Sequence, residues 1–384
     1  FPIFAGDVWT RSSCPPPLLL PANCLKRPEM GPMSGYSTLP QAIAKDQMML
    51  QIKRLDPADE LAITRWDAFV AACPHATFFH RAGWQRILED IFRHKTYFLF
   101  AEQSNRIEGV LPLAHVKSVL FGNALVAMPF AVYGGAVAES AEALEALEQE
   151  AQTIAKQLGV DYLELRQLDR HHDNWPTQDL YVTFRKEILP DVDANMQAIP
   201  RKQRAMVRKG IKNGLMSAID TNVDRFFALY ADNVHRHGTP ALPKRYFEAL
   251  RTVFGQDCEI LTITGADGRP LSSVLSFYFR KEVLPYYAGD DESARDIAAN
   301  DFKYWQLMCH AVCRGCTVFD FGRSKVGTGP YSFKRNWGFE EVRLPYEYKL
   351  VRARSLPQNN PLNPKFRLFI SAWRELPRGV VERV

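Results

Sequence analysis

The chain has 384 residues, of which 46% are hydrophobic and 24% charged, and its formal net charge is +5. This length exceeds one ordinary core and predicts two domains, and the composition is that of a globular protein. A net charge this small cannot attract nucleic acid by itself. Any site for a polyanion must therefore be a local patch of positive charge. Seven cysteines, an odd number in a long chain, indicate buried thiols in a reducing compartment and no zinc site.

Residues 1–47 differ in character from the rest of the chain. They contain the run Pro15-Pro16-Pro17 and show no sustained periodicity. The apolar run Leu18–Leu20 is too short for the core of a signal peptide. Patterned sequence begins after Met48, so we expect residues 1–47 to be a disordered or non-native leader outside the fold.

The stretch from Val119 to Ala138 carries no charge and has the length of a membrane span. Turn-forming residues interrupt it, among them Gly122, Pro129 and Gly134. Because a spanning helix would not tolerate this distribution, the pattern predicts two buried strands.

An internal repeat organises the chain. A helix, a strand, a tight turn and a second strand are predicted twice in the same order. The ranges are 86–92, 97–100, 104–105 and 109–113, and then 246–254, 260–263, 266–268 and 273–277.

The later part of each repeat also corresponds. Helices over 141–158 and 300–314 each stop at a glycine, and the strands 162–165 and 318–321 follow. Both strands place a carboxylate in the same position, Glu164 and Asp320. The order predicts an α/β fold with mixed sheets, in two tandem GNAT-like acyltransferase domains. The expected ranges are 48–190 for the first domain, 191–218 for a basic linker helix, 219–352 for the second domain and 353–384 for a tail.

The linker contains a strongly basic helix. No Asp or Glu occurs between residues 194 and 219, and Val207, Ile211 and Leu215 form an apolar stripe. Six cations fall on one face of this helix: Arg201, Lys202, Arg204, Arg208, Lys209 and Lys212. An ordinary solvated face is one interpretation. Since like charges without interleaved acids repel, a site for a polyanion is the other, either tRNA, a nucleotide-linked diphosphate or an anionic membrane face.

The strongest chemical signal is the Gly-rich segment 320–338, which follows the last strand of the second repeat. Ligands of open α/β sheets favour the carboxyl ends of strands. A fixed cation there can stabilise the oxyanion of acyl transfer, and we assign this role to Lys334. The planar fork of Arg323 suits a carboxylate or phosphate. Further substrate contacts are expected from Ser324, Gly327, Thr328, Tyr331, Trp337 and Tyr287.

Four elements together resemble the FemAB-related family of GNAT-like, BioF2-like acetyltransferase domains. They are Thr77-Phe78-Phe79-His80 with Trp84, Pro129 with Tyr133-Gly134-Gly135, the basic helix, and the segment from Asp320 to Gly338. The resemblance covers about residues 48–352. It is closest to the branch associated with exosortase (PEP-CTERM) exopolysaccharide systems.

The resemblance implies transfer of an acyl or aminoacyl group to an amine of a cell-envelope or exopolysaccharide precursor. It implies catalytic roles for Phe333 and Lys334, no tightly bound cofactor and no metal, and a cytoplasmic protein that contacts the inner membrane face. The donor stays open between aminoacyl-tRNA and an acyl thioester. Neither 133–139 nor 289–295 fits the pyrophosphate loop of CoA-dependent GNAT enzymes. A CoA-dependent acetyltransferase and a non-catalytic anion-binding module are the alternative functions.

Overall fold

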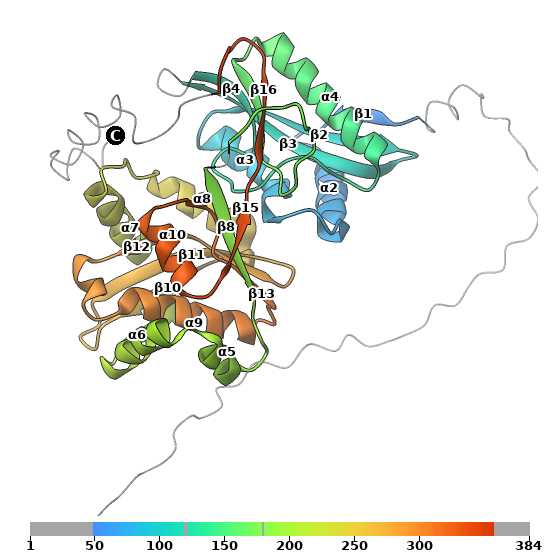
Figure 1. Ribbon diagram of the computed structural model, residues 1–384. Coiled ribbons are helices and arrows are strands. Elements are labelled where there is room, and N and C mark those ends of the chain that lie inside the picture. Colours follow the sequence, from blue (N-terminus) through green and yellow to red (C-terminus); the bar gives the residue numbers. More distant parts are fainter. Residues whose placement is uncertain (1–48, 119–121, 179, 357–384) are drawn as a thin grey trace, which may run out of the picture. The chain divides into compact units, whose positions relative to one another are not determined.

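The computed structural model describes residues 49–118, 122–178 and 180–356 (Figure 1). All of them belong to one unit of the chain, residues 45–384. The expected leader 1–47 and all but the first few residues of the expected tail 353–384 lie outside the described residues.

The first domain is built on a mixed sheet with strand order β1-β2-β3-β4-β6-β16-β7, and β5 pairs with β3. Among its described strands only β4 and β6 pair in parallel. Its elements in chain order are β1 (Gln51–Arg54), α2 (Glu60–Ala72), η1 (Phe78–His80), α3 (Gly83–Asp90), β2 (Lys95–Gln103), β3 (Arg106–Ser118), β4 (Gly122–Ala127), β5 (Val137–Ala138), α4 (Ala141–Leu158), β6 (Tyr162–Leu165) and β7 (Thr177–Gln178).

Both faces of this sheet are buried. Successive side chains of β2 point to opposite faces, and each meets a different core. Leu99 packs with the α4 side chains on one face, and Phe98 and Phe100 pack with α2 and α3 on the other. The α4 helix begins at Ser140, whose Oγ accepts a hydrogen bond from the N–H of Ala143, and ends at Gly159 in the left-handed conformation (φ 59°).

The second domain repeats this architecture on a sheet with strand order β14-β8-β13-β12-β11-β10-β9, and β15 pairs with β8. Its elements are β8 (Tyr181–Glu187), α5 (Val192–Ala198), α6 (Arg201–Lys212), β9 (Met216–Ile219), α7 (Asp224–Arg236), α8 (Lys244–Phe254), η2 (Gly255–Asp257), β10 (Cys258–Thr264), β11 (Pro270–Phe279), β12 (Glu282–Asp290), η3 (Glu292–Arg295), α9 (Ala299–Cys313), β13 (Val318–Asp320), β14 (Ser324–Lys325), α10 (Gly329–Asn336) and β15 (Glu340–Arg343). The chain then continues into β16 (Tyr346–Leu350).

The strand pairing near both boundaries of the second domain departs from the expected domain ranges. The β8 strand lies within the range 48–190 but pairs with β13 of the second sheet. The β16 strand lies within 219–352 but pairs with β6 and β7 of the first sheet. Strand pairing is a long-range contact, so the linear repeat does not contain this information.

The repeated order of helix, strand, turn and strand is confirmed in both domains, as is the fold class of two tandem GNAT-like domains with mixed sheets. The uncharged segment forms β4 and the short β5, joined by a buried loop over residues 128–136. No helix among the described residues is both long and apolar enough to cross a membrane.

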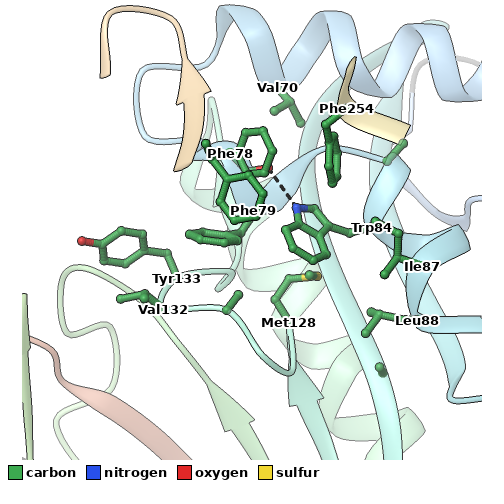
Figure 2. Close-up of a cluster of buried hydrophobic side chains, with 14 of the residues drawn as sticks. Val70, Phe78, Phe79, Trp84, Ile87, Leu88, Met128, Val132, Tyr133 and Phe254 are labelled. Atoms are coloured by element: carbon green, nitrogen blue, oxygen red, sulfur yellow. Dashed lines mark hydrogen bonds between the residues drawn. The ribbon is translucent and has the colours of Figure 1, made fainter. Parts of the chain in front are cut away.

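One aromatic core joins the two domains. Phe78 of η1 stacks on Phe277 of β11, with ring centroids 4.4 Å apart and the planes at 18°. Phe254, from α8 of the second domain, packs against Phe78 and Trp84, and the Trp84 indole donates a hydrogen bond to the Phe78 carbonyl (3.2 Å; Figure 2). Aromatic pairs of this kind stabilise beyond the area they bury, so this core resists separation of the domains.

Candidate active site

The candidate site lies where the parallel strands β12 and β13 of the second sheet part. Their pairing joins Glu282 to Val318 and Val283 to Phe319, and β12 then continues while β13 ends at Asp320. The gap at the carboxyl end of β13 receives the segment that follows it, residues 321–328, and then α10.

Asp320 anchors this strand end. The side chain is fully buried, and its carboxylate accepts hydrogen bonds from the Tyr133 hydroxyl (2.7 Å), the Thr183 hydroxyl (2.8 Å), an Arg185 Nη1–H (2.9 Å) and the Gly322 N–H (2.7 Å). Because these donors occupy both carboxylate oxygens, Asp320 serves to fix the turn. Tyr133 comes from the first domain, so the anchor also links the two sheets.

The path of the loop depends on two glycines with left-handed backbone, Gly322 (φ 69°) and Gly327 (φ 79°). Thr328 then caps the turn, its hydroxyl donating to the Lys325 carbonyl at 2.7 Å. Pro330 occupies the first turn of α10, where a missing N–H is harmless. Together the two glycines, the threonine cap and the proline allow α10 to begin close to the end of β13.

Lys334 reaches from α10 back over the strand end. Its ammonium donates to the Gly322 carbonyl (3.0 Å) and the Arg323 carbonyl (3.2 Å). An ammonium has three donors, and the third has no partner among the described residues. Burial lowers the pKa of Lys334 to about 8; the Asp320 carboxylate opposes this shift and the Arg323 cation adds to it. Lys334 therefore offers a half-buried positive charge with one free donor.

Phe333 lies behind Lys334 in the second core, with ring centroids 5.6 Å from Tyr304 and 6.1 Å from Trp337. This packing holds the α10 backbone against the sheet. Phe333 therefore positions its neighbour by packing.

Arg323 remains exposed although aromatic rings surround its guanidinium. The group lies 4.4 Å from the Tyr181 ring centroid and donates to the Tyr346 hydroxyl at 3.4 Å, while Tyr346 donates to the Val132 carbonyl at 2.7 Å. No carboxylate among the described residues forms an ion pair with Arg323. An oriented cation without a counter-ion suits an anionic group of a substrate.

The sequence interpretation missed three residues beside Arg323. Tyr346 comes from strand β16, Tyr286 of β12 donates to the Phe130 carbonyl at 2.7 Å, and Arg166 follows β6. The sequence does contain a pattern that points to Arg166, because Arg166 follows Glu164 much as Arg323 follows Asp320. No sequence pattern points to the two tyrosines, because long-range strand pairing brings them close to Arg323.

Three of the expected substrate contacts are engaged elsewhere. Trp337 is fully buried and its indole donates to Asp301 at 3.1 Å, so its assignment to substrate binding is corrected to a core role. The Tyr287 hydroxyl bonds to the Tyr246 hydroxyl at 2.9 Å, and the Tyr331 hydroxyl donates to Glu341 at 2.6 Å. The amphipathic pattern of α10 did not show which side the sheet would cover.

The remaining expected contacts line the loop itself. Ser324 is buried, and its hydroxyl has no hydrogen-bond partner in the described structure. Gly327 is exposed and Thr328 half-buried at the start of α10. Whether these residues meet a substrate stays a prediction.

The basic helix α6 covers only Arg201–Lys212 of the expected linker 191–218, which also contains α5 and β9, and it packs on α9, which makes it part of the second domain. A Cβ at Gly210 would meet Phe302 at 2.7 Å, which shows how closely the two helices approach. The buried side consists of Gln203, Val207 and Gly210. Of the apolar stripe, Val207 and Leu215 are buried, whereas Ile211 is 51% exposed.

The cationic side of α6 points away from α9. Five of its six cations are exposed and Arg204 is half-buried, donating to the Gln197 carbonyl at 3.0 Å. Within the described ranges no carboxylate forms an ion pair with any of the six. This leaves a concentrated positive surface.

Comparison with known proteins agrees with this architecture. Residues 199–335 match the family model described as an acetyltransferase (GNAT) domain, so the chain contains such a domain and is an acyltransferase. No curated protein is similar enough in sequence to match the chain.

Solved structures share the fold over most of the chain. FemX is 15% identical with a TM-score of 0.62, covering 79% of this chain and 98% of its own. L-PGS from Bacillus licheniformis is 14% identical with a TM-score of 0.52, covering 84% and 97%. A tandem GNAT protein from the clavulanic acid biosynthesis pathway is 12% identical with a TM-score of 0.53, covering 79% and 99%. At these identities the likeness concerns the fold alone.

Proposed function

We propose that this acyltransferase moves an acyl or aminoacyl group onto an amine of a cell-envelope or exopolysaccharide precursor, and that Lys334 stabilises the oxyanion of the reaction. The observation that carries the proposal is the Lys334 ammonium, half-buried above the end of β13, with one donor that no described residue engages.

The chemistry needs a fixed positive charge at this point. When the amine attacks the carbonyl carbon of the donor, a C–N bond forms and the carbonyl oxygen gains a negative charge. The bond from that carbon to the donor's oxygen or sulfur then breaks, and the amine loses a proton. A cation already held by two carbonyls stabilises the oxyanion without reorganising, as preorganised donors do.

Anionic parts of the substrates have two cationic sites available. Arg323, held between tyrosines, would bind a carboxylate or phosphate of the acceptor or donor. The exposed cations of α6 would bind a longer polyanion, for which tRNA is our first choice and the inner membrane face the second. Under this proposal the donor is an aminoacyl-tRNA or an acyl thioester, and no cofactor or metal is bound tightly.

The acceptor class rests on the FemAB resemblance and on the shared fold with FemX and L-PGS. We place the protein in the cytoplasm, in an exosortase-associated (PEP-CTERM) exopolysaccharide system. The matched acetyltransferase model favours a second candidate, a CoA-dependent acetyltransferase. A thermal-shift comparison of acetyl-CoA with aminoacyl-tRNA and nucleotide sugars separates the two, since only a ligand of the native state raises the melting temperature.

The direct test is Lys334→Met with the donor that this comparison selects. We expect kcat to fall by roughly 10²–10³, the usual loss for one oxyanion donor, with KM little changed. Lys334→Arg should rescue poorly, because a planar guanidinium does not reproduce a point charge. Phe333→Leu is the matched control, which should cost less because it loosens the lysine without deleting its charge.

A different split of the kinetic constants would contradict the assignment. If Lys334→Met raises KM and leaves kcat intact, Lys334 binds substrate and does not stabilise the oxyanion.

A further inference from the structure

The first domain has a cavity of its own at the corresponding strand end. It has a volume of about 310 Å³ and lies between the end of β6 and the start of α4. Apolar side chains such as Val137 and Leu144 line one part, and Gln167 and His171 line another. The cavity contains none of the residues assigned to acyl transfer.

His171 is the polar group best placed to meet a ligand there. Its Nδ1 bonds to the Glu148 carboxylate at 3.0 Å, which keeps a proton on that nitrogen. Glu148 is itself buried and also accepts from the Gln167 amide (2.7 Å) and pairs with His172 (3.1 Å). The ring nitrogen left for a ligand is His171 Nε2, which has no partner among the described residues.

The charges around His171 favour its cationic form. The hydrogen bond to Glu148 raises its pKa and burial opposes this, while Glu347 of β16 and Asp169 add to the rise. The Arg166 cation also lines the cavity but is paired with Glu164. Below this raised pKa the imidazolium presents an Nε2–H donor.

One further observation points to a ligand with a negatively charged end. Ser140 and Ala141 bring the N-terminus of the long helix α4 to the same wall, where free N–H groups favour negative charge.

We propose that this cavity binds a small aliphatic carboxylate, with His171 Nε2 donating to the carboxylate and the hydrocarbon body lying against Val137 and Leu144. The volume is at the lower end of ligand pockets, which suits a molecule of a few carbons. Glu139 and Asp169 at the rim disfavour a group with several negative charges, such as a diphosphate. The site does not depend on the chemistry assigned to Lys334.

The test uses the full chain with ¹³Cε1-labelled histidine and three probes: isobutyrate, its neutral isostere isobutyramide, and pyrophosphate. His171→Gln identifies the His171 signal. Isobutyrate should shift that signal saturably at about pH 6 and bind roughly tenfold more weakly at about pH 8.5, because a charge-assisted hydrogen bond is about twice as strong as a neutral one. Lys334→Met should bind isobutyrate as the natural chain does.

The outcomes separate clearly. Equal shifts with isobutyramide would mean a merely apolar cavity, and tighter binding of pyrophosphate would mean a diphosphate site. Either result, or no shift with isobutyrate, overturns the proposal. Thermal shift of the unmodified chain with the same three probes needs no variant, so the proposal stays testable if His171→Gln fails to fold. Loss of isobutyrate binding in Lys334→Met would tie the cavity to the catalytic site and also contradict it.

Discussion

The ends of β6 and β13 occupy equivalent places in the two domains, yet the cations that follow them are used differently. Arg166 donates to Glu164 (2.7 Å), the Ala131 carbonyl (2.7 Å) and the Met128 carbonyl (3.1 Å), so its guanidinium is committed to holding a loop. Arg323 lies between tyrosine rings, and no carboxylate in the described part of the chain pairs with it. In the second domain the carboxylate bonds to other donors, which leaves the nearby cations for a substrate.

The largest expected contrast is in stability. Arg166→Met should lower the free energy of unfolding by about 3–5 kcal/mol, because it leaves the buried Glu164 carboxylate without its partner. Arg323→Met should stay within about 0.5 kcal/mol, as at other exposed positions, while raising KM. Urea unfolding of both variants measures the contrast. Equal losses would show that Arg323 is also a structural residue.

A smaller loss is expected where the first domain meets the second strand end. Tyr133→Phe removes a hydrogen bond to the buried Asp320 carboxylate and should cost about 1.5–3 kcal/mol, the range for a bond to a charged group. Thr183 and Arg185 still bind that carboxylate, so the fold should persist. An unchanged unfolding midpoint would mean that the hydrogen bond from Tyr133 to Asp320 does not contribute to the free energy of unfolding.

The pH dependence of kcat should reflect the titration of Lys334 at the end of β13 and of no group at the end of β6. Since the charged form of Lys334 is the active one and its pKa is about 8, kcat should be level below that pH and fall about tenfold per unit well above it. In Arg323→Met this limb should move to higher pH, because a neighbouring cation that lowers the Lys334 pKa is gone. A limb that stays in place in this variant would assign the titration to another group.

The smallest effect on folding is expected at α6. Changing Arg201, Arg204 and Arg208 together to Gln should leave the melting temperature nearly unchanged, since these side chains lie on the solvent side. Binding of tRNA should weaken, and the slope of log K against log salt should flatten by about 2–3. The matched control is Gln203→Ala on the buried side, which should lower stability and leave the salt slope alone. An unaltered slope in the triple variant would make the basic surface an ordinary solvated face.

Local signals predicted most of the elements. Periodicity, caps and glycine stops gave the bounds of α4 and the repeated strand order, because each signal acts within a few residues. The Gly-rich segment likewise indicated Lys334 and Arg323, which the structure brings together through the bond from Lys334 to the Arg323 carbonyl.

What the sequence did not predict depends on long-range contacts. Tyr346 reaches Arg323 only because β16 returns to the first sheet, and no local pattern encodes that pairing. Trp337 and Ile211 show a second limit. An amphipathic helix shows which residues are apolar, but the side that is covered depends on the sheet or helix it meets.

The return of β16 to the first sheet also has a kinetic consequence. The first sheet joins Leu165 to Glu347, so the strand between β6 and the edge strand β7 is missing until almost the whole described chain has left the ribosome. Closing so long a loop is slow, and the uncovered edge of β6 is open to wrong partners meanwhile. Cutting the chain between β7 and β8 would make this state permanent in the first fragment. Co-translational folding should therefore stall at an incomplete first sheet, which is finished only when β16 emerges.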